Sequence, residues 1–116
     1  MKNQVRLCHA QEIADGTSRG FDPEASGRDT LFVVRSGDSL CAWRNVCPHW
    51  EGTSMAWRKD EYLSADRRHI VCAAHGAQFD IFSGVCTLGP CLGESLIPIS
   101  LTFDVDQNMY AAIDNI

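Results

Sequence analysis

The chain has little positive charge and no long apolar segment. Its 116 residues carry 10 lysines and arginines against 15 aspartates and glutamates, a formal net charge of −5. Nucleic acids and anionic membranes select for basic patches, so this balance argues against either as a partner. No apolar run approaches the roughly 20 residues that a membrane helix needs, and Met1–Arg6 lacks the apolar stretch of a signal peptide. The sequence therefore predicts one soluble, cytoplasmic domain.

Helical periodicity is also missing, and short strand-like runs take its place. Ala14–Asp29 is rich in Asp, Gly and Ser and is expected to be a long surface loop. Ser54–Glu61 can hold one helical turn, and Pro98 must lie at an edge or a bulge because it cannot donate to a ladder. The pattern is typical of an all-β sandwich or small barrel. The predicted strands are Gln4–His9, Thr30–Arg35, Leu40–Val46, Glu61–Ser64, His69–Ala73, Gln78–Phe82, Ser95–Val105 and Met109–Ile113.

Six cysteines are unusual in so short a chain. Without an export signal the thiols are expected to stay reduced, which favours metal binding over disulfides. Cys8 and Cys41 lie in strand-like runs and are expected to be small buried apolar residues. Cys86 and Cys91 lie close together in the sequence, and packing, a disulfide and redox sensing all stay open for them.

Two fragments each pair a thiol with an imidazole. Cys47 and His49 have C-x-H spacing, and Cys72 and His75 have C-x-x-H spacing. Each fragment follows a strand-like run, so two loops can present four donors to one site. Tetrahedral zinc accepts two Cys and two His and stays an alternative, although zinc fingers place like ligands in one arm. Mixed arms suit a Rieske [2Fe–2S] centre better, because there two Cys hold one iron and two His hold the other.

Other metal chemistry fits the sequence less well. His49-Trp50-Glu51 matches the H-x-E of zinc deaminases, but the P-C-x-x-C that this class also needs is missing. A mononuclear oxygenase iron needs two His and a carboxylate. The remaining His9 and His69 lie in separate strand-like runs and are expected to be structural or surface residues. We therefore expect no catalytic activity from the chain itself.

The segments CPHW (residues 47–50) and CAAHGAQFD (residues 72–80) resemble the paired motifs of Rieske iron–sulfur proteins. The similarity runs from about residue 30 to the C-terminus and includes Phe82–Gly84 and Gly89–Cys91. It implies a Rieske fold of antiparallel β-sheets in one domain (1–116). A cluster-binding subdomain of about 46–90 would sit on a base domain formed by 1–45 and 91–116. The stretch around 55–68 is longer than in the shortest ferredoxins of the family and is expected to decorate the subdomain or touch a partner.

The resemblance also implies a ligand set. Cys47, His49, Cys72 and His75 would bind one [2Fe–2S] cluster per chain.

The residues around the motifs indicate which kind of Rieske protein the chain resembles. Respiratory high-potential members carry two further cysteines, together with a Ser and a Tyr that donate to the cluster region. Here Gly52 and Ala74 occupy the cysteine positions, and Ala77 and Phe79 the hydroxyl positions. Without those donors the reduced cluster loses stabilisation, so the potential should fall toward the lower end of the approximate −150 to +300 mV range.

This pattern resembles the soluble Rieske-type ferredoxins. Such a protein would carry single electrons from a flavin-dependent reductase to a terminal enzyme, such as a Rieske-type ring-hydroxylating oxygenase. The alternative is a Rieske-like small subunit of a larger oxidoreductase, similar to the small subunit of assimilatory nitrite reductase.

Overall fold

The computed structural model describes residues 4–48, 55–56, 59–73 and 76–113. Within these ranges the regular secondary structure is almost entirely β, as expected, and the helical structure is one 3₁₀ turn, η1 (Ala10–Glu12). No helix of this part of the chain is long and apolar enough to cross a bilayer. The strands are β1 (Gln4–His9), β2 (Ser18–Phe21), β3 (Leu31–Ser36), β4 (Ser39–Arg44), β5 (His69–Val71), β6 (Gln78–Asp80), β7 (Cys86–Leu88), β8 (Pro98–Ile99), β9 (Leu101–Phe103) and β10 (Asn108–Ala112).

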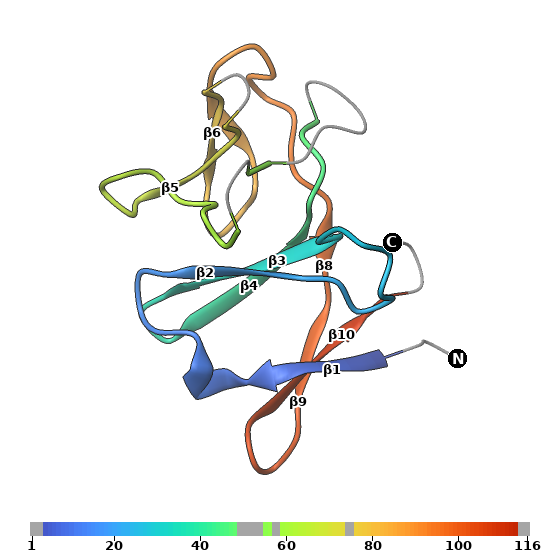
Figure 1. Ribbon diagram of the computed structural model, residues 1–116. Coiled ribbons are helices and arrows are strands. Elements are labelled where there is room, and N and C mark those ends of the chain that lie inside the picture. Colours follow the sequence, from blue (N-terminus) through green and yellow to red (C-terminus); the bar gives the residue numbers. More distant parts are fainter. Residues whose placement is uncertain (1–3, 49–54, 57–58, 74–75, 114–116) are drawn as a thin grey trace.

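The strands form three antiparallel sheets. Their orders are β1-β10-β9, β2-β3-β4-β8 and β5-β6-β7. Figure 1 shows the third sheet at the top of the molecule, the four-stranded sheet below it and β1, β9 and β10 at the far end. We call the first two sheets the base and the third the upper sheet. The chain leaves the base after β4 and returns to it at β8, which places Cys47 and Cys72 in the upper part.

Strand β3 separates two apolar cores. Leu31 and Val33 join one core while Phe32 and Val34 join the other, because alternate residues of a strand point to opposite faces. All four side chains are fully buried, which explains why this strand reads as a continuous apolar run. The base core also contains Cys8, Ile13, Phe21, Ala42, Ile99, Met109 and Ala111. The upper core also contains Trp43, Cys47, Met55, Tyr62, Ile70, Cys72, Ala77, Phe79, Ile81, Cys86, Cys91 and Leu96.

Two expectations about strands are wrong in detail. Ala14–Asp29 is not all loop, since β2 lies within it and pairs with β3; its polar sequence hides a strand that long-range backbone pairing stabilises. Ser95–Val105 is not one strand, because β8 pairs with β4 in one sheet and β9 pairs with β10 in another. Pro98 lies on β8, an edge strand, as its missing N–H requires.

The remaining expectations about individual segments have mixed outcomes. Cys8 is buried as expected, whereas Cys41 is half-buried. Glu61–Ser64 forms only an isolated bridge, from Leu63 to Ile70, and β7 was not expected. The predicted helical turn Ser54–Glu61 falls partly outside the described residues, and inside them Lys59 and Asp60 form a turn.

Trp43 connects the base to the upper part of the molecule. It lies on β4, is 4% exposed, and packs beneath the turn that follows β6. In that turn Asp80 Oδ2 accepts from the backbone N–H groups of Phe82 (3.0 Å) and Ser83 (2.6 Å). Gly84 closes it with a φ of +74°, and a Cβ there would lie 2.6 Å from Trp43 Cζ3. The position therefore requires glycine for its conformation and for its contact.

We predict that Gly84→Ala costs more stability than a matched glycine substitution. Gly37 also has a positive φ (+62°), but a Cβ there meets no atom within 4 Å. Gly37→Ala should cost only the left-handed conformation, about 1–2 kcal/mol. Gly84→Ala should add the displacement of Trp43, for a total of roughly 2–4 kcal/mol. Urea unfolding of both variants measures the difference, and equal losses would contradict the role of the Trp43 contact.

Candidate metal centre

Both motif cysteines follow a strand and turn into the same core. Cys47 comes three residues after β4 ends, and Cys72 directly follows β5. Each is 0% exposed, and both belong to the upper core. The two thiols that the sequence analysis singled out are therefore brought into one buried, apolar environment.

Asn45 positions the chain around the first motif. Of the polar and charged residues that the structure describes, Asn45 alone is fully buried. Its backbone N–H donates to the Thr30 carbonyl (2.9 Å), and its side-chain Nδ2 donates to the Asp29 carbonyl (2.9 Å). Its Oδ1 accepts from the Met55 N–H (2.8 Å). The Asn45 side chain thus connects Asp29, in the loop before β3, to Met55, which lies eight residues after Cys47 in the sequence.

The second motif is closed on itself and joined to the first. The Cys72 N–H donates to the Ala77 carbonyl (2.9 Å), and the Gly76 N–H donates to the Cys72 carbonyl (2.8 Å). The Ala73 N–H donates to the Met55 carbonyl (2.8 Å). Because Met55 also donates to Asn45, one buried residue holds the two cysteine loops side by side.

The two predicted histidine ligands, His49 and His75, lie outside the described residues, as do Gly52 and Ala74. Within the described ranges, no three His, Cys, Asp or Glu side chains are arranged to hold a metal ion. A site at Cys47 and Cys72 therefore needs donors from outside these ranges. Two buried thiols in one core fit a thiolate-bound iron or zinc.

The other two histidines, His9 and His69, lie outside the two motifs and take part in the local structure of the chain. His9 Nδ1 accepts from the Gln11 N–H (3.0 Å) and caps η1. His69 lies on β5, opposite Asp80 of β6 in the ladder. The structural role expected for His9 is confirmed.

The surroundings of the two thiols are apolar. Ala77 and Phe79 are fully buried in the upper core with Cys47 and Cys72, and neither side chain carries a donor. Gly89, with a φ of +113°, lies so close to Ala77 that a Cβ on it would be 2.9 Å from the Ala77 Cα. The segment containing Gly89 and Pro90 therefore lies directly against the second cysteine loop.

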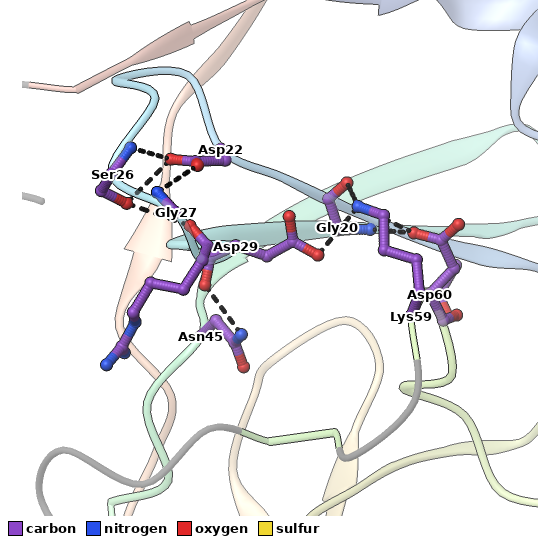
Figure 2. A network of polar contacts seen from close by, with 10 residues as sticks. Gly20, Asp22, Ser26, Gly27, Asp29, Asn45, Lys59 and Asp60 are labelled. Carbon is purple, nitrogen blue, oxygen red and sulfur yellow. Dashed lines mark hydrogen bonds and ion pairs between the residues drawn. The ribbon is translucent and has the colours of Figure 1, made fainter.

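A polar network fastens the stretch that follows the first motif to the base. Lys59 Nζ donates to the Gly20 carbonyl (2.9 Å) and forms an ion pair with Asp29 Oδ2 (2.8 Å). Asp60 Oδ1 accepts from the Gly20 N–H (2.7 Å). Figure 2 shows Lys59 between Gly20, Asp29 and Asp60, with Asn45 bonded to the other side of Asp29. The described residues of 55–68 are thus tied to β2 and to the loop before β3.

Asn45 was not predicted from the sequence. A polar residue two positions before a C-x-H motif, directly after a strand, is the signal that indicates it. A buried amide in that place must be hydrogen-bonded on both sides. The partners themselves cannot be read from the sequence, because Asp29 and Met55 lie 16 and 10 residues away.

The matching family model and the similar solved structures agree on the kind of protein that this chain resembles. The family model described as "Rieske [2Fe-2S] domain" matches residues 3–111. The ferredoxin of carbazole 1,9a-dioxygenase from Nocardioides aromaticivorans IC177 is similar in structure, with a TM-score of 0.71 and 26% identity over 95% of this chain and 97% of that chain. The ferredoxin of Sphingomonas yanoikuyae B1 has a TM-score of 0.68 and 23% identity over 98% and 100%.

A third similar structure is a chain from the complex of reduced oxygenase and oxidized ferredoxin in carbazole 1,9a-dioxygenase. It has a TM-score of 0.72 and 23% identity over 97% of this chain and 94% of that chain. No curated protein matches this sequence.

We predict that Asn45→Ala weakens both folding and metal retention. The change leaves the Met55 N–H and the Asp29 carbonyl without their partner, and each buried unpaired group costs about 1–3 kcal/mol. Unfolding by urea should show a loss of roughly 2–4 kcal/mol, with a lower iron content after reconstitution. Asn108→Ala is the control, because the amide of Asn108 bonds to Arg6 and Asp104 near the surface. If both variants keep full iron content, Asn45 does not position the site.

Proposed function

The chain belongs to the Rieske [2Fe–2S] domain family, whose model matches residues 3–111, and we propose that it carries single electrons to a terminal Rieske-type oxygenase. Membership implies a Rieske-type [2Fe–2S] cluster as cofactor. The observation that carries the proposal is the near-complete mutual coverage, 95% and 97%, with the ferredoxin of a dioxygenase. Because that similar protein is itself a ferredoxin, the chain is proposed to act as a carrier and not as a catalyst.

We propose that Cys47 and Cys72 hold one iron and that His49 and His75 hold the other. The full burial of both sulfurs in one core supports this assignment, as does the Met55 link between the loops. When bound, the cluster supplies reversible one-electron chemistry. The chain's own residues position its ligands, exclude water from the two sulfurs and limit the donors around them.

The partners follow from the carrier role. An obligate one-electron carrier must be reloaded after each transfer, and a flavin-dependent reductase is suited to this because a flavin can release electrons one at a time. The structure of an oxygenase complexed with ferredoxin in carbazole 1,9a-dioxygenase supports the proposed oxygenase partner. Docking should be transient, with less than about 1,200 Å² buried, as in other redox encounters.

We further propose that the chain is one Rieske domain with a cluster-binding subdomain of about 46–90 on a base of 1–45 and 91–116. The separate upper sheet β5-β6-β7 supports this division. A cytoplasmic location is proposed because the structure pairs none of the six cysteines in a disulfide, which suits a reducing compartment.

The carrier role is tested by electron transfer. The reconstituted protein should be reduced by a flavin-dependent ferredoxin reductase with NADH and reoxidised by an oxidised Rieske oxygenase, both followed by visible absorption in a stopped-flow instrument. It should also elute as a monomer or small oligomer without a large partner. A protein that purifies in a tight complex and exchanges no electrons as a free component would instead be the small subunit of a larger oxidoreductase.

The ligand assignment predicts distinct results for neighbouring substitutions. Cys47→Ser should lower the bound iron more than about tenfold, since even residues that only support ligands typically change metal affinity 10–100-fold. Cys41→Ser, on the preceding strand, should leave the visible spectrum unchanged.

His75→Cys should change the spectrum and lower the potential because a thiolate replaces an imidazole, whereas His69→Ala should not. A normal spectrum in Cys47→Ser, or one altered by His69→Ala, would mean that the ligands are misassigned. A colourless protein that binds zinc after anaerobic reconstitution would contradict the iron site.

We predict that Ala77→Ser raises the reduction potential. Ala77 is fully buried with the two cysteines, so a hydroxyl there can donate to the sulfur-rich site and stabilise the added electron. A hydrogen bond to a charged group contributes about 1.5–3 kcal/mol, and part of it should appear as a rise on the order of tens of mV. Ala73→Ser adds the same hydroxyl at an exposed position and should leave the potential unchanged. A redox titration measures both, and no difference between them would refute a role for position 77.

A further inference from the structure

A second pair of cysteines meets inside the upper core. The sulfurs of Cys86 and Cys91 are 3.1 Å apart, and both are free thiols. The two residues are only 1% and 2% exposed. A disulfide has an S–S distance of about 2.05 Å, so the sulfurs need to approach by only about 1 Å. Nothing in the proposed electron-carrier function uses this pair.

The backbone around the pair keeps the two cysteines facing each other. The Cys86 N–H donates to the Glu94 carbonyl (2.7 Å), and the Gly93 N–H donates to the Cys86 carbonyl (3.1 Å). The Glu94 N–H donates to the Cys91 carbonyl (2.9 Å), which completes the loop. These bonds close residues 86–94 into a compact hairpin-like loop. The sulfur contact is therefore held by the main chain and does not depend on a particular surface side chain.

The two thiols also form a hydrogen-bonded chain. Cys91 Sγ donates to Cys86 Sγ (3.1 Å), and Cys86 Sγ donates to the Leu88 carbonyl (3.3 Å). Burial, the hydrogen bond to Cys86 and the nearby charges of Cys86 and Cys47 raise the pKa of Cys91. Cys86 is the sulfur that accepts the hydrogen bond. The pair shares the upper core with Cys47, a proposed cluster ligand.

We propose that Cys86 and Cys91 form a reversible, peroxide-oxidised disulfide within the folded protein. Hydrogen peroxide is the oxidant because sulfurs so nearly covered admit only a small molecule. Cys86 Sγ attacks one peroxide oxygen, the O–O bond breaks, and the Cys86 proton leaves with the other oxygen as water. Cys91 Sγ then attacks the sulfenic sulfur of Cys86, the S–O bond breaks, and the Cys91 proton leaves in a second water. Two thiols and one peroxide thereby give one disulfide and two waters.

The disulfide would restrain the segment that lies against the second cysteine loop. Its ring spans residues 86–91 and includes Gly89, whose backbone packs against Ala77. In the reduced protein this segment is held by backbone hydrogen bonds and packing. In the oxidised protein a covalent bond would close it as well. The pair is therefore a modification site next to the proposed cluster, and its chemistry is independent of electron delivery to an oxygenase.

Peptide mapping of the peroxide-treated holoprotein tests the proposal. The anaerobically purified, cluster-loaded protein is treated with hydrogen peroxide, alkylated and cleaved after Asp and Glu. The peptide 81–94 then contains Cys86 and Cys91 and no other cysteine. We expect this peptide to lose two hydrogen masses, to carry no alkyl groups, and to regain two alkylatable thiols after dithiothreitol. Visible absorption, recorded in parallel, should show that the cluster is still bound when the disulfide forms.

The controls separate this site from general oxidation. Cys86→Ser and Cys91→Ser should each abolish the two-hydrogen loss in peptide 81–94, whereas Cys41→Ser should retain it. The mapping of the wild-type protein stands even if a variant folds poorly. Doubly alkylated peptide after peroxide, or one cysteine carried to a sulfinic or sulfonic acid, would overturn the proposal. A disulfide that forms only as the cluster absorption disappears would also overturn it, because the pair would then react only in damaged protein.

Discussion

The site depends on the hydrogen bonds that Met55 makes in two directions. Its N–H donates to the side chain of Asn45, which follows β4, and its carbonyl accepts from Ala73, which follows Cys72. Met55 is itself fully buried. Unpaired backbone groups are costly in such surroundings, so the two cysteine loops have few alternative arrangements. This explains how Cys47 and Cys72, far apart in sequence, are brought into one core.

The upper sheet is too small to be stable by itself. Three strands of three residues each need a larger apolar surface to pack on, and the base provides one through Phe32 and Trp43. Phe32 stacks on Tyr62 with ring centroids 4.2 Å apart and planes 6° from parallel. Trp43 lies under Gly84. Burial raises the pKa of Tyr62, so its phenol stays neutral in this contact. The upper sheet is therefore supported by the base at several points, with Lys59 and Asp29 adding a partly exposed ion pair.

Local patterns predicted the parts of the structure that local forces determine. The strands β3 and β4 and the edge position of Pro98 follow from periodicity and the missing proline N–H. Strand β2 was not predicted from the sequence, because its polar residues pair with β3 through the backbone. The split between β8 and β9 did not follow either, since it depends on which distant strand each half meets. For the site, the spacing of the motifs identified Cys47 and Cys72, which lie in one core, but gave no sign of Asn45.

The sequence by itself determined the kind of cofactor and indicated the proposed donor set. Two thiols and two imidazoles in mixed pairs suit a pair of irons because ligand preference belongs to the side chains themselves. Only the tertiary structure decided what surrounds those donors. It placed Met55 between the loops and brought the sulfurs of Cys86 and Cys91 into contact. The physical reason is that ligand preference belongs to individual side chains, whereas burial, hydrogen-bond partners and sulfur–sulfur distances arise only when strands distant in sequence pack together.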